Sequence, residues 1–174
     1  MDVDELRRAL GSIVLEAAYM ERTLRTAFSA LIGSKYAAVV DERLMASALI
    51  EDCERLTRYH TDIPAAAKET VLTALQSCHE ANRERNRVIH DTWATRPGTT
   101  MVTLHGGRNS HDVQVTARAL TDVGQVANRL ADAADDVKAA MTGALGPHWA
   151  QVEDQLRQEL GHDLNAGRGG GQER

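Results

Sequence analysis

The sequence predicts an all-α fold: a bundle of four or five helices with a small β-hairpin inserted after the third helix. Hydrophobic residues make up 43% of the 174 residues but aromatic residues only 3%. The core must therefore consist of Ala, Leu, Val, Ile and Met, which favours closely packed helices. Apolar residues recur at helical spacing through most of the chain. The prolines, at positions 64, 97 and 147, fall between the periodic segments.

The first two helices follow from this periodicity. Residues 2–32 form one long amphipathic pattern that ends at Gly33 and Ser34. Residues 35–60 form a second helical region, strongest over 41–59, and a turn follows at Pro64. The inward-facing positions of the first helix are Leu6, Leu10, Ile13, Ala17, Met20, Leu24, Ala27, Phe28 and Leu31.

The third helix is predicted over residues 65–94, because Arg96, Pro97 and Gly98 follow it. The period then changes from helical to alternating. Residues 100–105 and 112–117 alternate between polar and apolar side chains, and a glycine-containing turn separates them. This pattern is typical of a β-hairpin.

Two further helices and a tail complete the chain. Helix is predicted over 121–145, is interrupted by Gly146 and Pro147, and resumes over about 148–160 until Gly161. Residues 165–174 are rich in glycine and polar residues, and we expect them to be disordered. The length is that of a single domain, which we place at residues 1–164.

Charge, hydropathy and cysteine usage narrow the functional classes. A formal net charge of −5 argues against broad, non-specific binding to nucleic acid. No apolar run approaches the ~20 residues of a membrane span, and no signal sequence opens the chain. Cys53 and Cys78 lack metal-binding spacing. We therefore expect a cytoplasmic protein that does not associate with membranes.

A metal site and a cofactor are not expected either. His105 and His111 flank the predicted hairpin turn, with Asp112 adjacent. Two paired strands could bring these histidines together, but no third ligand stands at a suitable spacing. The sequence therefore predicts chemistry without a metal ion.

An arginine occupies the apolar stripe of the third helix. On a helical wheel Arg85 falls where an aliphatic residue is expected. A buried guanidinium is costly unless a carboxylate meets it. Glu21 of the first helix is the preferred partner and Glu16 the alternative. For Arg85 alone, an ion pair that fixes the helix register is the commoner explanation. The stripe consists of Val71, Ala74, Leu75, Cys78, Ala81, Val88, Ile89 and Thr92.

Polar residues line one edge of this stripe. Asn86 and His90 are four residues apart and share a face of the helix. Histidine can exchange a proton at physiological pH, and arginine can hold a phosphate. Because RNA carries its own nucleophile, the 2′-hydroxyl, these groups suffice to cleave it without metal. His79 lies on the same edge with Arg83 just beyond it, whereas Arg87 and Glu84 point away.

The segment Arg85-Asn86-Arg87-Val88-Ile89-His90 resembles the Arg-polar-x-x-x-His signature of the HEPN superfamily. Asn86 is the polar follower of Arg85, and four residues separate Arg85 from His90. The following Asp91-Thr92-Trp93 is also similar to family members, in which a polar residue and an aromatic residue often follow the histidine. The resemblance covers roughly residues 2–145.

The resemblance implies a dimeric helical bundle with two Arg–His pairs in one interfacial cleft. Many family members are metal-independent endoribonucleases of toxin–antitoxin, abortive-infection or antiviral systems. Carried over, Arg85 would position the scissile phosphate, His90 would act as general acid or base, and Asn86 would orient His90. Glu21, Arg83 and His79 would support the site. The expected partners are an RNA substrate, a second copy of the chain and, in a toxin system, an antitoxin.

An alternative remains open. Some HEPN proteins are inactive and serve as helical interaction or nucleotide-binding modules. Such a module would partner another protein, for example a nucleotidyltransferase. Arg85 would then lock the core, and the motif would carry no catalysis.

Overall fold

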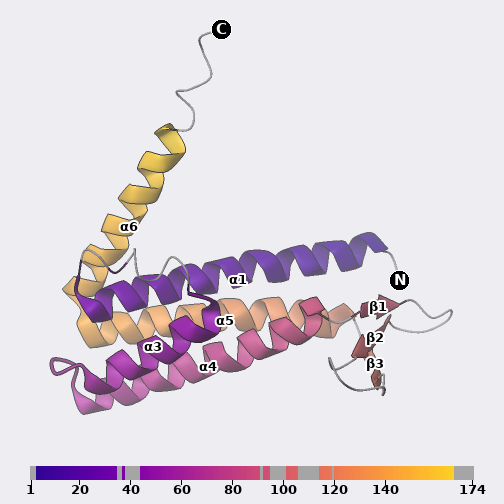
Figure 1. Cartoon of the computed structure of the whole chain (residues 1–174), viewed down its shortest axis with the longest axis horizontal. Helices are drawn as coiled ribbons and strands as arrows, with labels where there is room; N and C mark the ends of the chain where they lie inside the picture. Colours follow the sequence, from indigo (N-terminus) through magenta and orange to yellow (C-terminus); the bar gives the residue numbers. More distant parts are fainter. Residues whose placement is uncertain are drawn as a thin grey trace, which may run out of the picture.

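The computed structural model describes residues 3–34, 37, 44–90, 92–94, 101–105, 114–118 and 120–166. Within these residues the chain is a helical bundle, which confirms the predicted class. Figure 1 shows three long helices lying side by side, a shorter helix along part of the bundle, and a last helix that leaves it. The helices are α1 (Val3–Ile32), α3 (Ala46–Tyr59), α4 (Ala65–His90), α5 (Leu120–Leu145) and α6 (Pro147–Ala166).

The helices α1, α5, α4 and α3 enclose the core in that order. Helix α5 packs against α1 and α4, and α3 packs against the same two helices. Contacts between α1 and α4 themselves are few. The Tyr19 hydroxyl of α1 donates a hydrogen bond of 2.7 Å to the Asp135 carboxylate of α5. An ion pair between Glu84 and Arg129 joins α4 to α5.

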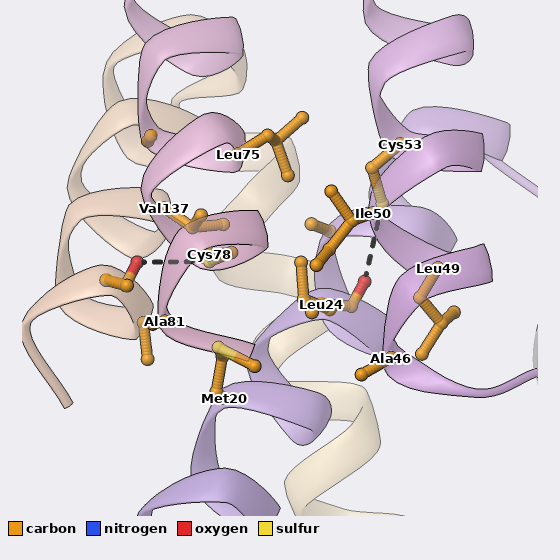
Figure 2. Close-up of a cluster of buried hydrophobic side chains, with 14 of the residues drawn as sticks. Met20, Leu24, Ala46, Leu49, Ile50, Cys53, Leu75, Cys78, Ala81 and Val137 are labelled. Atoms are coloured by element: carbon orange, nitrogen blue, oxygen red, sulfur yellow. Dashed lines mark hydrogen bonds between the residues drawn. The ribbon is translucent and has the colours of Figure 1, made fainter. Parts of the chain in front are cut away.

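The core contains side chains from all four of these helices (Figure 2). Both cysteines lie in it, and they form no disulfide with each other. The Cys53 thiol donates to the Leu24 carbonyl oxygen at 3.7 Å, and the Cys78 thiol donates to the Ala133 carbonyl oxygen at 3.5 Å. Each bond joins two helices. Fully buried members include Ile13, Met20, Leu24, Leu49, Ile50, Leu75, Val88, Leu130, Val137 and Met141.

Two glycines end helices at the predicted positions. Gly33 follows α1 with φ +63°, and its N–H donates to the Ser29 carbonyl oxygen at 3.0 Å. Gly146 follows α5 with φ +53°, and its N–H donates to the Thr142 carbonyl oxygen at 2.9 Å. A left-handed residue satisfies carbonyl groups at a helix end, and glycine adopts that conformation without a Cβ clash.

A small sheet connects α4 to α5. Strands β1 (Thr92–Ala94), β2 (Met101–His105) and β3 (Gln114–Arg118) form an antiparallel sheet in the order β1-β2-β3. Strand β2 falls in the first segment with alternating polarity, and β3 overlaps the second and ends one residue beyond it, at Arg118. Thr103 lies opposite Thr116.

The predicted extension of the third helix to Ala94 is wrong, because α4 ends at His90. Residues Thr92–Ala94 pair with β2 instead. Threonine and tryptophan suit a strand, and the neighbouring strand supplies hydrogen bonds that a helix end lacks. Helical periodicity alone did not reveal this partner.

Helix α6 is longer than predicted. It continues through Gly161 to Ala166, so residues 165–166, expected to be disordered, are helical. One internal glycine costs a helix only ~1 kcal/mol relative to alanine. Residues 167–174 of the predicted tail lie outside the described residues.

The beginning of α6 is anchored to the bundle. Trp149 is buried, and Lys138 of α5 pairs with Glu153 at 2.7 Å. A His148 ring nitrogen lies 3.1 Å from the Ala30 carbonyl oxygen. Beyond this anchor α6 projects from the bundle (Figure 1). Among the described helices, none combines the length and the apolar composition needed to cross a membrane.

Two leucines of α1 test the packing directly. Leu24 is fully buried, whereas Leu15 is 71% exposed. Leu24→Ala should lower the free energy of unfolding, measured in urea, by about 2–5 kcal/mol because it opens a cavity. The matched control Leu15→Ala should change it by less than about 0.5 kcal/mol. Equal losses in the two variants would contradict this packing.

Cysteine labelling tests the core independently. Burial, reinforced by the Asp136 carboxylate, raises the pKa of the Cys78 thiol to about 12. The thiolate is the reactive form, so an alkylating reagent at pH 8 should not modify Cys78 in the native protein. It should modify Cys78 readily in urea, as read by mass spectrometry. Native labelling as fast as that of a free thiol would show that this region is open.

Candidate functional site

A cleft lies on α4 beside the beginning of α3. Helix α3 has 14 residues and α4 has 26, so α3 does not cover the whole of α4 (Figure 1). Ser47, in the first turn of α3, forms part of the cleft wall. The cleft has a volume of about 540 Å³ and is otherwise lined by one face of α4: Gln76, His79, Glu80, Asn82, Arg83, Asn86, Arg87 and His90.

Helical spacing brings the side chains of this face together. His79, Arg83 and Arg87 follow one another at intervals of four positions, and Asn86 and His90 are also four positions apart. Side chains at this spacing are neighbours along one face of the helix. The opposite side of α4 is apolar, with Ala81 and Val88 buried in the bundle. Burial of that side fixes the rotation of α4 and thereby turns the polar face outward.

Arg85 does not line the cleft. Its Nη1 donates a hydrogen bond of 2.9 Å to Oδ1 of Asn86. Its Nε is buried and has no hydrogen-bond partner in the described structure. The side chain as a whole is half-buried. The prediction that Arg85 is buried in the apolar stripe therefore holds for its Nε but not for the whole side chain.

The predicted ion pair between Arg85 and Glu21 is not formed. Among the described residues the Asn86 amide, and no carboxylate, meets the Arg85 guanidinium. The cause is the helix arrangement, because α1 packs chiefly on α5 and α3 and makes few contacts with α4. Neither Glu21 nor Glu16 lines the cleft.

The bond from Arg85 also orients the Asn86 amide. Because Oδ1 accepts from Arg85, the NH₂ group is the part of the amide left for the cleft that Asn86 lines. An amide NH₂ can only donate hydrogen bonds. Asn86 therefore adds a donor beside Arg83, Arg87 and the two histidines, which suits an anionic ligand.

The cleft holds two arginines that form no ion pair with the described residues. Within the described part of the chain, no carboxylate forms an ion pair with Arg83 or Arg87, and both side chains are exposed. The carboxylate in the cleft wall, Glu80, accepts a hydrogen bond from Gln76 at 3.2 Å. Several arginines elsewhere do pair with carboxylates, whereas Arg8 donates to a backbone carbonyl and Arg22 lies over the Tyr19 ring. The paired arginines are Arg7, Arg55, Arg58, Arg129 and Arg157.

The acidic residues of this region gather on another side of α4. A second, smaller pocket of about 300 Å³ between α4 and α5 is lined by Glu80, Glu84, Asp132 and Asp136. Arg129 lies in it and pairs with Glu84. The acidic net charge of the chain thus coexists with a locally cationic cleft.

The structure brings together most of the residues proposed from the sequence. His79, Arg83, Asn86 and His90 line one cleft, with Arg85 behind Asn86. Arg87, predicted to point away from the apolar stripe, is exposed, and it also lines the cleft. The helical wheel places Arg87 beyond the edge of the apolar stripe, but it does not show how far around α4 the cleft extends.

Ser47 and Asn82 were missed for different reasons. Ser47 belongs to another helix, and nothing in the local sequence indicates that α3 begins beside Arg83. Asn82 is buried although it is polar and directly follows Ala81 of the apolar stripe. A polar residue at that place was the signal in the sequence that could have identified it.

No arrangement of three or more metal-binding side chains occurs among the described residues, and His111 and Asp112 lie outside them. No family model matches the chain, and no similar curated protein or solved structure was found. What the cleft can do must therefore be worked out from its own side chains.

A stability measurement tests the account of Arg85. A buried donor without a partner costs about 1–3 kcal/mol. Arg85→Met should therefore leave the free energy of unfolding in urea unchanged or raise it by up to about 1 kcal/mol. Arg87→Met removes the same charge from an exposed position and should change stability by less than about 0.5 kcal/mol. A loss above about 2 kcal/mol in Arg85→Met would indicate a structural ion pair instead.

Proposed function

We propose that the protein is a metal-independent endoribonuclease of the HEPN type, with its active site in the cleft of α4. The observation that carries this proposal is the composition of the cleft. Two histidines, two arginines that pair with no carboxylate among the described residues, and an amide oriented as a donor share one wall. These groups can bind phosphate and transfer protons, which are the functions that RNA cleavage without a metal ion requires.

The proposed reaction uses the 2′-hydroxyl of RNA as nucleophile. His90 accepts its proton as the oxygen attacks the adjacent phosphorus, and the 5′-oxygen leaves with a proton from a general acid. The products are a 2′,3′-cyclic phosphate and a 5′-hydroxyl. Cationic and amide donors stabilise the charge that develops on the phosphoryl oxygens. In this scheme Asn86 and the arginines bind, and His90 transfers the proton.

A homodimer would complete this scheme. His79 and His90 are eleven residues apart, about 16 Å along the helix axis, so one phosphodiester cannot contact both. A second copy of the chain, docked on the face of α4, would bring another His90 to the same phosphate. One histidine would then act as base and the other as acid. The sequence resemblance also favours this dimer and a role as a toxin or antiviral nuclease.

A second function is supported by the size of the cleft. At about 540 Å³ it falls in the range of small-molecule sites, and the same cations could hold the phosphates of a nucleotide. The chain would then be a non-catalytic binding module that works with another protein. Activity on RNA separates the two functions.

Cleavage assays test the proposed nuclease. Wild-type protein should cleave a mixed RNA pool in EDTA and leave 2′,3′-cyclic phosphate ends, whereas DNA should remain intact. His90→Ala should lower the rate by about 10²–10⁴-fold, the usual contribution of general acid–base catalysis. His60→Ala, in the turn between α3 and α4, is the matched control and should cleave like the wild type.

Two results would count against the nuclease. Cleavage by a folded His90→Ala protein at the wild-type rate would remove His90 from the mechanism. Intact RNA throughout, together with saturable binding of a nucleotide in the cleft, would favour the binding module.

A further inference from the structure

Arg83 and Arg87 are placed to hold two phosphate groups at once. They are one turn apart on the same helix, so their Cβ atoms are separated by about 6 Å. Both line the cleft and both are exposed. In the described part of the molecule neither has a carboxylate partner, although arginines such as Arg58 and Arg129 do.

We infer that Arg83 and Arg87 form a binding site for two successive phosphates of a single-stranded polynucleotide, whereas Arg85 does not contact the ligand. This inference rests on the proposed function, because it names the residues that would hold the substrate of that site. It reassigns phosphate binding from the arginine of the sequence motif to the two arginines that flank it.

The geometry of α4 separates the three arginines. Arg85 donates to Asn86, and its Nε is buried, so it reaches the ligand only through the Asn86 amide. Arg83 and Arg87 line the cleft directly, as does Asn86. Arg85 is thus a positioning residue, and the direct contacts come from the neighbouring side chains.

A linear ligand fits this arrangement better than a compact one. The donors His79, Arg83, Arg87 and His90 follow one helix over about 16 Å. A nucleoside triphosphate concentrates its charge on adjacent phosphates, which one arginine and its neighbours could hold. An extended strand carries a charge at each nucleotide and can contact successive turns of α4. A strand of a few nucleotides is therefore the ligand that can contact all four of these donors along α4.

Binding of a DNA hexamer measures this site without any cleavage. Fluorescence anisotropy with 5′-labelled hexathymidylate reports affinity, and the absence of 2′-hydroxyls prevents the proposed reaction. Arg83→Gln and Arg87→Gln should each weaken binding roughly tenfold, as expected for loss of a charged hydrogen bond. Each should also make the dependence of log K on log salt shallower by about 0.7.

Arg58→Gln is the matched control, because it removes the same charge from an arginine that is paired with Glu54 on α3. It should bind the hexamer like the wild type. Arg85→Met should weaken binding less than either cleft variant and should leave the salt slope unchanged. Circular dichroism checks that each variant is folded.

The outcomes separate this inference from the nuclease. Hexamer binding that depends on Arg83 and Arg87, with no RNA cleavage by the wild type, would support the site and contradict the nuclease. RNA cleavage by the wild type, with no effect of Arg83→Gln or Arg87→Gln on hexamer binding, would support the nuclease and contradict the proposed phosphate site. Tighter binding of ATP or tripolyphosphate than of the hexamer would overturn the choice of a strand as ligand.

Discussion

The position of the site depends on how α4 is covered. Helix α5 packs along the apolar side of α4, and residues such as Cys78 and Val88 are fully buried. Helix α3 begins only at Ala46, and its first turn marks the edge of the cleft. Burial by α5 fixes the rotation of α4, and the limited length of α3 leaves a polar face accessible. Packing and site are therefore two consequences of the same helix arrangement.

Arg85 links the core to this face. A buried guanidinium Nε that has no partner among the described residues is unfavourable for stability, and an aliphatic residue would suit the apolar stripe better. Arg85 instead orients Asn86, because its hydrogen bond to Oδ1 leaves the NH₂ group of the amide for the cleft. Residues that weaken local packing while ordering a cleft are expected where function competes with stability.

The sequence predicted the parts of the molecule that depend on local patterns. The apolar stripe of α1, the glycine ends at Gly33 and Gly146, and the shared face of Asn86 and His90 all follow from spacing along one helix. The absence of the predicted ion pair between Arg85 and Glu21 did not, because it depends on which helices are neighbours. Likewise the strand at Thr92–Ala94 depends on pairing with β2, and the place of Ser47 in the cleft depends on where α3 meets α4.

In the proposed complex the ligand contacts Arg83 and Arg87, whereas the half-buried Arg85 keeps its hydrogen bond to Asn86. Arginine Nε–H correlations in a ¹H–¹⁵N NMR spectrum, recorded during titration with the DNA hexamer, measure this directly. We expect the Arg83 and Arg87 signals to shift with the ligand, and a slowly exchanging Arg85 signal to move little. Large shifts of Arg85 with unmoved Arg83 and Arg87 would contradict it.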